Sequence, residues 1–277
     1  MLDKTILVTG STDGIGKQTA LDLARMGARV LIHGRDPEKV RLTYEEIAGR
    51  TGNENLAVYV ADFASLAQVR EMAARVLAEQ PRLDVLVNNA GIFEPHRRLT
   101  ADGVELTLQV NYLAPFLLTN LLLDLLKRSA PSRIVNVASG VHAGAELEWD
   151  NLQGQRHYDG WGAYATSKLC DVLFTFALAE RLKGTGVAAN CFGPGAIRTK
   201  LLGAGWGRAF GEPPEVGAQQ AVYLATSPEV EGISGRYFEA NRPVAPSPLA
   251  EDEQARRHLW DLSAQLVGLT RAKKSAA

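Results

Sequence analysis

The feature that most limits how this chain can fold is a glycine-rich turn that directly follows a short apolar run. Residues 6–8 are Ile-Leu-Val, which predicts a buried strand, and residues 9–16 read TGSTDGIG. The three glycines of this turn let the backbone amides at the start of the next helix approach a bound phosphate closely. A strand, a glycine turn and a helix in this order predict the first unit of a nucleotide-binding α/β fold. A plain strand–helix turn, with glycine used only for its geometry, is the alternative.

Strand-like and helix-like segments alternate along almost the whole chain. Short β-branched or apolar runs predict strands at residues 6–9, 29–33, 56–60, 83–88, 133–138, 187–192 and 236–239. Helical patterns fill the intervals, at 15–26, after the cap Asp36, from the cap Ser65 to 78, and at 103–128, 162–182, 215–226 and 251–267. Continuously apolar strands joined by helices predict a parallel sheet covered on both faces. We expect one doubly wound α/β domain of about seven strands over residues 1–270, and a flexible tail at 271–277.

The overall composition is that of a globular protein without a strong electric field. Of the 277 residues, 46% are hydrophobic and the net charge is −1, so neither nucleic acid nor an anionic membrane is an expected partner. Cys170 and Cys191 fall in predicted regular elements and show no metal-ligand spacing. The most apolar stretch, 116–126, is too short for a membrane span. Because metal-ligand spacing is absent, we expect no bound metal. Because no secretory leader precedes the first strand, we expect a cytoplasmic protein.

A second motif lies far along the chain, inside the predicted helix at 162–182. It reads YATSK and places Tyr164 and Lys168 four residues apart, on one face of the helix. An ammonium close to a phenol favours the phenolate and so lowers the pKa of the tyrosine. The pair can therefore serve as a proton donor and acceptor near neutral pH. The alternative is a pair at the rim of the helix, with the lysine reaching into solvent.

Together with further motifs in the same order, these residues resemble the short-chain dehydrogenase/reductase family, and within it the retinol-dehydrogenase type and related bacterial members. The resemblance covers about residues 4–238. The matching motifs are TGxxxGxG at 9–16, NNAG at 88–91, a helix asparagine at Asn111, a serine at Ser139, YxxxK at Tyr164 and Lys168, and PG at 194–195. It implies a Rossmann fold, a nicotinamide cofactor and hydride transfer between a carbonyl and an alcohol.

The resemblance assigns catalytic roles to four residues. Tyr164 is implied to be the general acid and base, and Ser139 to hydrogen-bond the substrate oxygen. Lys168 is implied to lower the pKa of Tyr164 and to bind the nicotinamide ribose. Asn111 is implied to hold a water that links Lys168 to solvent. In isolation, Asn111 would be a helix-interior amide satisfied by a neighbouring carbonyl, and Ser139 would be an ordinary hydroxyl at the end of a strand.

The cofactor itself is implied to bind along the glycine turn and the ends of the strands. The residues expected around it are Gly10, Ser11, Thr12, Asp13, Gly14, Ile15, Gly16, Arg35, Asp62, Phe63, Asn89, Ala90, Gly91, Tyr164, Lys168, Pro194, Gly195, Ile197 and Thr199. Asp62 has an open alternative, since it can instead organise the start of the helix capped by Ser65.

The cofactor expected from these residues is NADP(H), with NAD(H) possible. The second strand ends in His-Gly-Arg, and Arg35 offers a planar fork suited to a phosphate. Asp36, which would otherwise suit NAD, is expected to cap a helix before Pro37. Asp13 weakens this interpretation because it brings negative charge near the ribose. A solvated loop charge is the alternative for Arg35.

Two segments are expected to shape the substrate site. The stretch between Ser139 and Tyr164 has 24 residues, and its insert at 141–160 is expected either to border the entrance or to be a surface loop. Residues 196–214 are apolar and rich in glycine, which predicts a mobile lid. The residues expected to contact the substrate, unless they pack into the core, are Phe93, Val141, Trp161, Trp206 and Phe210. A lipophilic ketone, aldehyde or alcohol is the expected substrate.

Other functions stay open on the same motifs. A reductase of C=C bonds or an epimerase can use the same tyrosine and lysine, and a non-catalytic dinucleotide-binding regulator can use the same fold. The joint presence of Asn111, Ser139, Tyr164 and Lys168 argues against the regulator. The apolar helices that contain 111–126 and 164–182 predict a homodimer, unless the 141–160 segment covers them and leaves a monomer.

Overall fold

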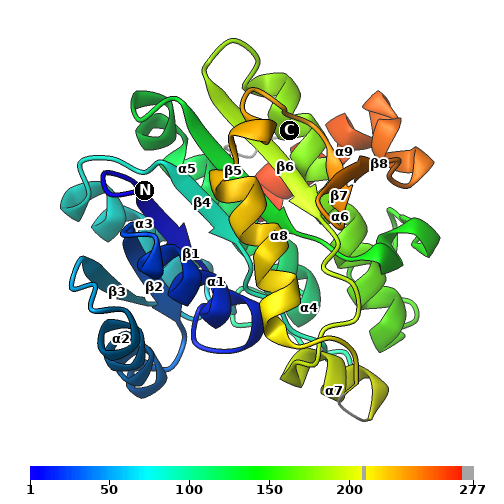
Figure 1. Ribbon diagram of the computed structural model, residues 1–277. Coiled ribbons are helices and arrows are strands. Elements are labelled where there is room, and N and C mark those ends of the chain that lie inside the picture. The colour runs from blue at the N-terminus through cyan, green and yellow to red at the C-terminus, as the bar shows by residue number, and fades with distance from the viewer. Residues whose placement is uncertain (208–209, 270–277) are drawn as a thin grey trace.

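In the computed structural model, which describes residues 1–207 and 210–269, eight strands form a single sheet (Figure 1). Its order is β3-β2-β1-β4-β5-β6-β7-β8, and all neighbours are parallel except β7 and β8. The strands are β1 (Thr5–Val8), β2 (Arg29–Gly34), β3 (Leu56–Val60), β4 (Val85–Asn88), β5 (Ser132–Val137), β6 (Val187–Phe192), β7 (Tyr237–Glu239) and β8 (Arg242–Val244). Because β1 lies between β2 and β4, the strand order reverses at the carboxyl end of β1, which is where ligands bind in such sheets. The expected doubly wound, Rossmann-like fold is confirmed.

Helices cover both faces of the sheet, as Figure 1 shows. One face carries α1 (Gly14–Arg25), α2 (Pro37–Thr51) and α8 (Pro214–Thr226), and the opposite face carries α3 (Leu66–Glu79), α5 (Ala114–Arg128) and α6 (Gly160–Arg181). Each layer encloses its own apolar core, since the strands are buried on both sides. The helix α9 (Glu253–Leu266) packs on the outside of α6.

Helix caps follow the predicted local chemistry. The Asp36 carboxylate accepts hydrogen bonds from the amides of Glu38 and Lys39 at the start of α2, and the Ser65 hydroxyl accepts one from Gln68 at the start of α3. Each cap satisfies amides that have no partner inside the helix. The carboxylate of Asp36 is thus occupied by backbone, as predicted.

The long helix expected at 103–128 contains an irregular turn. It begins as α4 (Leu106–Leu108), passes through a π-helical turn at Gln109–Leu113 and continues as α5. Pro115 has no N–H, so the α-helical bond to the carbonyl of Asn111 cannot form. By length and hydropathy the segment Leu106–Arg128 could cross a membrane, but 78% of its most apolar window is buried inside the fold. That burial is typical of a core helix.

Two short elements differ from the predictions. β8 adds an eighth strand, joined to β7 by Ala240 and Asn241, which both have positive φ. β8 was not predicted because it has three exposed residues, one of them Pro243, and therefore lacks an alternating pattern. The segment expected to be a lid contains a helix, α7 (Lys200–Trp206), which is capped by Thr199. This helix was not predicted because the glycines within it have a low helix propensity.

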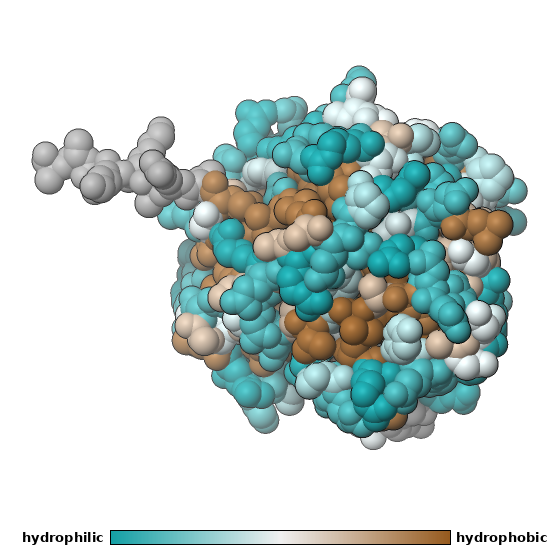
Figure 2. Space-filling view, turned by 90° about the vertical axis from the view of Figure 1, so that its left-hand side faces the viewer, coloured by the Kyte–Doolittle hydropathy of each residue, from teal (hydrophilic) through white to brown (hydrophobic). Residues whose placement is uncertain are grey.

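The outer surface is mostly polar, with scattered apolar patches on the face shown in Figure 2. β3 forms one edge of the sheet, and its Val58 and Val60 are among the exposed hydrophobic residues. On α6 and α5, Phe174 and Phe116 contact Trp260 of α9. The C-terminal helix therefore covers part of the apolar surface on which the homodimer prediction rests, and the oligomeric state stays a prediction.

A buried histidine joins β2 to the glycine turn. The Nδ1 atom of His33 accepts a hydrogen bond from the Gly10 amide at 3.0 Å, and its Nε2 lies 3.1 Å from the carbonyl oxygen of Ala61. Only a neutral ring can accept at Nδ1 while it donates at Nε2. Burial lowers the pKa of His33 from 6.5 to about 4, although the Ala61 carbonyl and Asp62 act in the opposite direction. The turn is therefore supported by a histidine that stays neutral at neutral pH.

We predict that His33 makes the fold sensitive to acid. Between pH 6.5 and about 4 the unfolded chain binds a proton that the folded chain does not bind. This contribution to stability is complete above pH 6.5 and falls by about 3 kcal/mol on acidification through that window. His33→Asn keeps an acceptor for Gly10 without titrating, so urea unfolding from pH ~7 to ~4.5 should show a weaker pH dependence. His96→Asn, at an exposed position, is the control and should match the parent. Equal pH dependence in all three proteins would contradict the prediction.

Candidate active site

The glycine turn is fastened to the segment that follows β4. The Thr9 hydroxyl accepts hydrogen bonds from the amides of Asn89 and Ala90, at 2.9 and 3.1 Å. In return the Asn89 side chain donates to the carbonyl oxygens of Thr9 and Gly10, at 2.8 and 3.2 Å. These bonds cross between the two strands at which the sheet order reverses. The predicted motifs at 9–16 and 88–91 are therefore one structural unit.

Two glycines of the turn are required by close packing. Gly10 has φ of +64°, and a Cβ on it would lie 2.8 Å from the Cα of Ala90. A Cβ on Gly16 would lie 2.2 Å from the side-chain nitrogen of Asn89. Any larger residue at either position would push the turn away from the segment at 88–91. Close approach within the protein thus explains these glycines before any ligand is considered.

Several side chains of the turn face the protein. The Ser11 hydroxyl accepts from the His33 amide at 2.9 Å, and a methyl of Thr12 packs against Gly34. Ile15 packs against Gly217 of α8. The side chains of Ser11 and Ile15 therefore make contacts within the protein.

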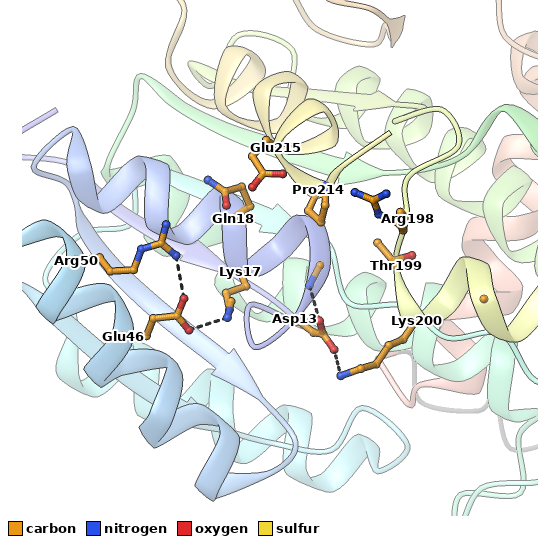
Figure 3. A pocket seen from close by; sticks show the side chains of 12 residues that line it. Asp13, Lys17, Gln18, Glu46, Arg50, Arg198, Thr199, Lys200, Pro214 and Glu215 are labelled. Atoms are coloured by element: carbon orange, nitrogen blue, oxygen red, sulfur yellow. Dashed lines mark hydrogen bonds and ion pairs between the residues drawn. The ribbon is translucent and has the colours of Figure 1, made fainter. Parts of the chain in front are cut away.

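The start of α7 lies against the glycine turn. Asp13 caps α1 and forms an ion pair with Lys200 at 2.5 Å, and the methyl group of Thr199 lies next to Gly14 (Figure 3). The negative charge of Asp13, expected to weaken phosphate binding, is thus offset by a lysine. The nearby Ile197 is buried, and Gly195 has φ of +80°.

Beside this contact lies a hollow of about 500 Å³ between α1, α2 and α8 (Figure 3). Three of its charged groups pair with one another, because Glu46 accepts from both Lys17 and Arg50, at 2.6 and 2.9 Å. It is lined by Asp13, Gly14, Lys17, Gln18, Glu46, Arg50, Arg198, Thr199, Lys200, Gly203, Pro214 and Glu215. Tyr164 and Lys168 are not among these residues, so the hollow does not contain the predicted catalytic pair.

The remaining residues predicted near the adenosine differ in accessibility. Arg35 is exposed at the end of β2 and, within residues 1–207 and 210–269, forms no ion pair. Phe63 is buried and stacks on His33 at 4.5 Å, so its side chain points into the core. One carboxylate oxygen of Asp62 accepts from the Ala64 amide at 2.9 Å. The local structural role considered for Asp62 is therefore present.

On α6 the predicted tyrosine and lysine lie side by side and are buried. The Lys168 ammonium lies 5.9 Å from the centre of the Tyr164 ring and donates to the Val137 carbonyl oxygen at 2.8 Å. It also donates to the carboxylate of Asp171 at 2.9 Å. Ser139, two residues after β5, lies close enough to the Tyr164 phenol for its hydroxyl to lower the pKa of that phenol. The interpretation of the pair as a solvent-exposed rim is therefore wrong, because α6 packs against β5 and β6.

The electrostatics of Tyr164 partly differ from the prediction. Burial raises the pKa of Tyr164 above its usual 10, while the Lys168 charge and the hydrogen bond from Ser139 lower it and Asp171 raises it. Lys168 thus acts in the predicted direction, but in the protein alone it does not outweigh burial. The Lys168 ammonium itself stays charged, because its carboxylate partner raises its pKa against the effect of burial.

Asn111 organises the neighbourhood of this pair from the π-helical turn. Its side-chain oxygen accepts from the Ile92 amide at 2.8 Å, and its nitrogen donates to the Ile92 carbonyl oxygen and the Ser167 hydroxyl, both at 3.0 Å. Gly91 lies directly over Asn111 and Lys168. The side chain of Asn111 is therefore used to place the chain after β4, which the sequence did not indicate.

An aromatic row extends outward from Tyr164. The ring centre of Trp161 lies 6.0 Å from that of Tyr164 and 3.8 Å from that of Trp206. The ring centres of Trp206 and Phe210 are 5.7 Å apart. Phe93 contacts Trp161 at 4.8 Å. Four of the predicted substrate residues therefore form one cluster next to the phenol. The fifth, Val141, is half-buried, and its amide donates to Ser139.

The insert at 141–160 is anchored at both ends. His142 is buried, with Nδ1 at 2.7 Å from the Ser139 carbonyl oxygen and Nε2 accepting from the Ser247 amide at 3.1 Å. Tyr158 donates to the Glu94 carbonyl oxygen at 2.9 Å. A hollow of about 260 Å³ separates residues 144–159 from the start of α6. His142 is therefore a structural tether.

Comparison with known proteins identifies the family. A family model described as short chain dehydrogenase matches residues 4–206. Retinol dehydrogenase 13 of Mus musculus is 45% identical over 288 residues, covering 98% of this chain and 86% of that protein. Retinol dehydrogenase 14 of Homo sapiens is 43% identical over 300 residues, covering 97% of this chain and 88% of that protein.

Solved structures agree with this assignment. An uncharacterized protein from Mycobacterium paratuberculosis has a TM-score of 0.78 and 32% identity, covering 96% of this chain and 93% of that one. A protein described as a short chain dehydrogenase from Escherichia coli CFT073, complexed with NADPH, has a TM-score of 0.71 and 28% identity, covering 86% of this chain and 97% of that one. The chain therefore belongs to the short-chain dehydrogenase family and is an oxidoreductase of the retinol-dehydrogenase type.

Proposed function

We propose that this protein is an NADP(H)-dependent oxidoreductase that interconverts a lipophilic ketone or aldehyde and the corresponding alcohol. The observation that carries the proposal is the placement of a buried Tyr164, supported by Lys168 and Ser139, at the inner end of an aromatic row. The phenol supplies the proton chemistry, and the aromatic side chains supply an apolar surface for the substrate.

In carbonyl reduction, Tyr164 donates its phenolic proton to the substrate oxygen as that oxygen gains negative charge. Ser139, whose hydroxyl lies beside the phenol, hydrogen-bonds the same oxygen and holds it in place. The bound nicotinamide supplies or accepts the hydride. Lys168 stabilises the phenolate that remains. In alcohol oxidation, Tyr164 as phenolate accepts the proton.

The residues present fit a nicotinamide dinucleotide. An ammonium has three donors, and Lys168 uses two of them on Val137 and Asp171, which leaves one for a ribose hydroxyl. The start of α1 provides helix N-terminal amides for the pyrophosphate. The Asn111 carbonyl, released from its α-helical bond by Pro115, is suited to a relay water near Lys168.

Three features favour NADP(H) over NAD(H). Arg35 is exposed and unpaired among the described residues, Asp36 is occupied as a helix cap, and Asp13 is paired with Lys200. Because both carboxylates are engaged by other groups, a phosphate on the adenosine ribose would be attracted by the Arg35 guanidinium and repelled little by Asp13 and Asp36. The relative from E. coli complexed with NADPH agrees with this preference.

The lipophilic substrate is supported by the aromatic row and by the names of the relatives, which are retinol dehydrogenases. C=C reduction and epimerisation use the same proton chemistry and remain the alternative within the family, while a non-catalytic regulator would have no use for the buried pair. The cytoplasmic location, the homodimer and the absence of a nucleic-acid partner stay predictions from the sequence.

We predict that Tyr164→Phe removes most turnover with a carbonyl substrate. General acid–base groups contribute roughly 10²- to 10⁴-fold to rate, so kcat should fall by about that factor while NADPH binding persists. Steady-state NADPH oxidation and cofactor titration measure the two effects. Tyr223→Phe, which removes an exposed phenol bonded to Glu229, is the matched control and should keep the parental rate. A Tyr164→Phe enzyme with near-parental kcat would show that another group donates the proton.

We predict that Arg35→Ala weakens NADPH selectively. A hydrogen bond to a charged group contributes about 1.5–3 kcal/mol, so the Kd of NADPH should rise roughly 10- to 150-fold. The Kd of NADH, measured by the same calorimetric titration, should change little. Arg41→Ala, which removes an exposed arginine paired with Glu38 on α2, controls for net charge. Equal losses for both cofactors, or tighter parental binding of NADH, would refute the preference.

We predict that Trp206→Ala impairs large lipophilic substrates. The side chain is 45% exposed at the outer end of the aromatic row, so its loss removes apolar contact without opening the core. An aromatic contact of about 1.5–3 kcal/mol corresponds to roughly a 10- to 150-fold lower kcat/KM for a long-chain aldehyde. Acetaldehyde should be affected far less. Trp149→Ala, which removes a tryptophan in the insert that contacts His258, is the control and should keep the parental kcat/KM. An equal loss of kcat/KM by Trp206→Ala for short and long aldehydes would contradict this placement of the substrate.

A further inference from the structure

The buried carboxylate of Asp171 has no role among the motifs that identify the family. Asp171 lies three residues after Lys168 on α6, and their side chains are 6% and 5% exposed. Its Oδ2 accepts from the Lys168 ammonium at 2.9 Å. Within residues 1–207 and 210–269, the Asp171 carboxylate hydrogen-bonds to no other group. The carboxylate is therefore directed at the one cation that the proposed reaction requires.

We propose that Asp171 is a positioning residue for the reaction: it holds the Lys168 ammonium in place and sets the pH range in which Tyr164 exchanges its proton. This inference rests on the proposed function of Tyr164 and Lys168. A buried ion pair contributes little to stability by itself, because desolvation offsets the attraction. The position of this ion pair beside a proton-transfer group is better explained by a role in holding the Lys168 ammonium and in setting the charge near Tyr164.

Asp171 gives Lys168 a defined orientation. Val137 and Asp171 each accept one hydrogen from the ammonium, at 2.8 and 2.9 Å, which leaves the third without a partner among the described residues. A lysine side chain has several rotatable bonds, and two fixed acceptors reduce the freedom of its end. The third N–H is then available to the ribose, and the ammonium lies 5.9 Å from the centre of the Tyr164 ring.

The charge of Asp171 acts on Tyr164 in the direction opposite to that of Lys168. The pKa of Tyr164 is raised by burial, lowered by Lys168 and raised by Asp171. Burial raises the pKa of Asp171 itself to about 6, with Lys168 opposing, so the carboxylate is ionised at neutral and alkaline pH. Tyr164 therefore faces an ion pair whose carboxylate moderates the effect of the ammonium.

The other titratable groups near Asp171 do not supply a competing charge. Tyr112 of the π-helical turn, Cys170 on α6 and Cys191 on β6 each have a pKa raised by burial and, further, by Asp171. All three stay neutral where alcohol oxidation would be measured. Replacing Asp171 with a neutral residue therefore changes one charge near Tyr164 and Lys168.

Asp171→Asn keeps a side chain of the same shape that can still accept from Lys168, but it removes the charge. Without that charge the pKa of Tyr164 falls, and the pKa of Lys168 falls because its carboxylate is lost. For alcohol oxidation at saturating NADP⁺, both limbs of the kcat/KM profile against pH should shift to lower pH. Asp171→Glu keeps the charge and should retain the parental profile. Asp171→Ala loses charge and acceptor and should lose at least about tenfold in kcat.

Asp84→Asn is the matched control, since Asp84 is another buried carboxylate, paired with Lys4 and Arg82 away from Tyr164. It should lower stability and leave the pH profile unchanged. If Asp171→Asn does not fold, as judged by circular dichroism, Asp171→Ser serves as the neutral variant. A neutral variant whose profile overlays the parent, or moves to higher pH, would overturn the inference. Parental protein without turnover that depends on Tyr164 would instead overturn the proposed function.

Discussion

The structure depends on how an ammonium is kept charged inside an apolar helix layer. Lys168 is buried on α6, and its charge is stabilised by the carbonyl of Val137 and the carboxylate of Asp171. Because an unpaired buried charge is costly, the lysine would otherwise be neutral or displaced. The packing of α6 on β5 and β6 brings these acceptors to it. The same packing buries Tyr164 and raises its pKa, so the phenol and the ion pair form one electrostatic unit.

A second set of polar contacts places this unit beside the cofactor site. Thr9 and Asn89 bind the glycine turn to the chain after β4, and Asn111 binds the same chain three residues after Asn89, at Ile92. His33 supports the turn from the other side. Each bond is between a side chain and backbone, so the turn, the end of β4 and the π-helical turn keep a fixed relation. The start of α6 then presents Trp161 and Tyr164 toward the same edge of the sheet.

Features encoded by adjacent residues could be predicted from the sequence, and those created by distant contacts could not. The caps at Asp36 and Ser65, the glycine turn and the burial pattern of the strands depend on local chemistry, and the structure confirms them. The contact between His33 and Gly10 spans 23 positions and requires the sheet order to be known. The sequence does show an acid, Asp171, three residues after Lys168 in an apolar helix. Its burial could not be predicted, because it results from the packing of α6 against β5 and β6. The net pKa of Tyr164 was likewise not predictable, since burial opposes the lysine.

The central claim is that hydride passes between the nicotinamide and a carbonyl carbon while Tyr164 handles the proton on oxygen. The most direct measurement uses NADPH carrying deuterium at the transferable position of the nicotinamide, with a lipophilic enal as substrate and mass spectrometry of the product. The account predicts an allylic alcohol with one deuterium on the carbinol carbon and the C=C bond intact. Deuterium on the β-carbon of a saturated aldehyde, or an unlabelled product, would contradict it.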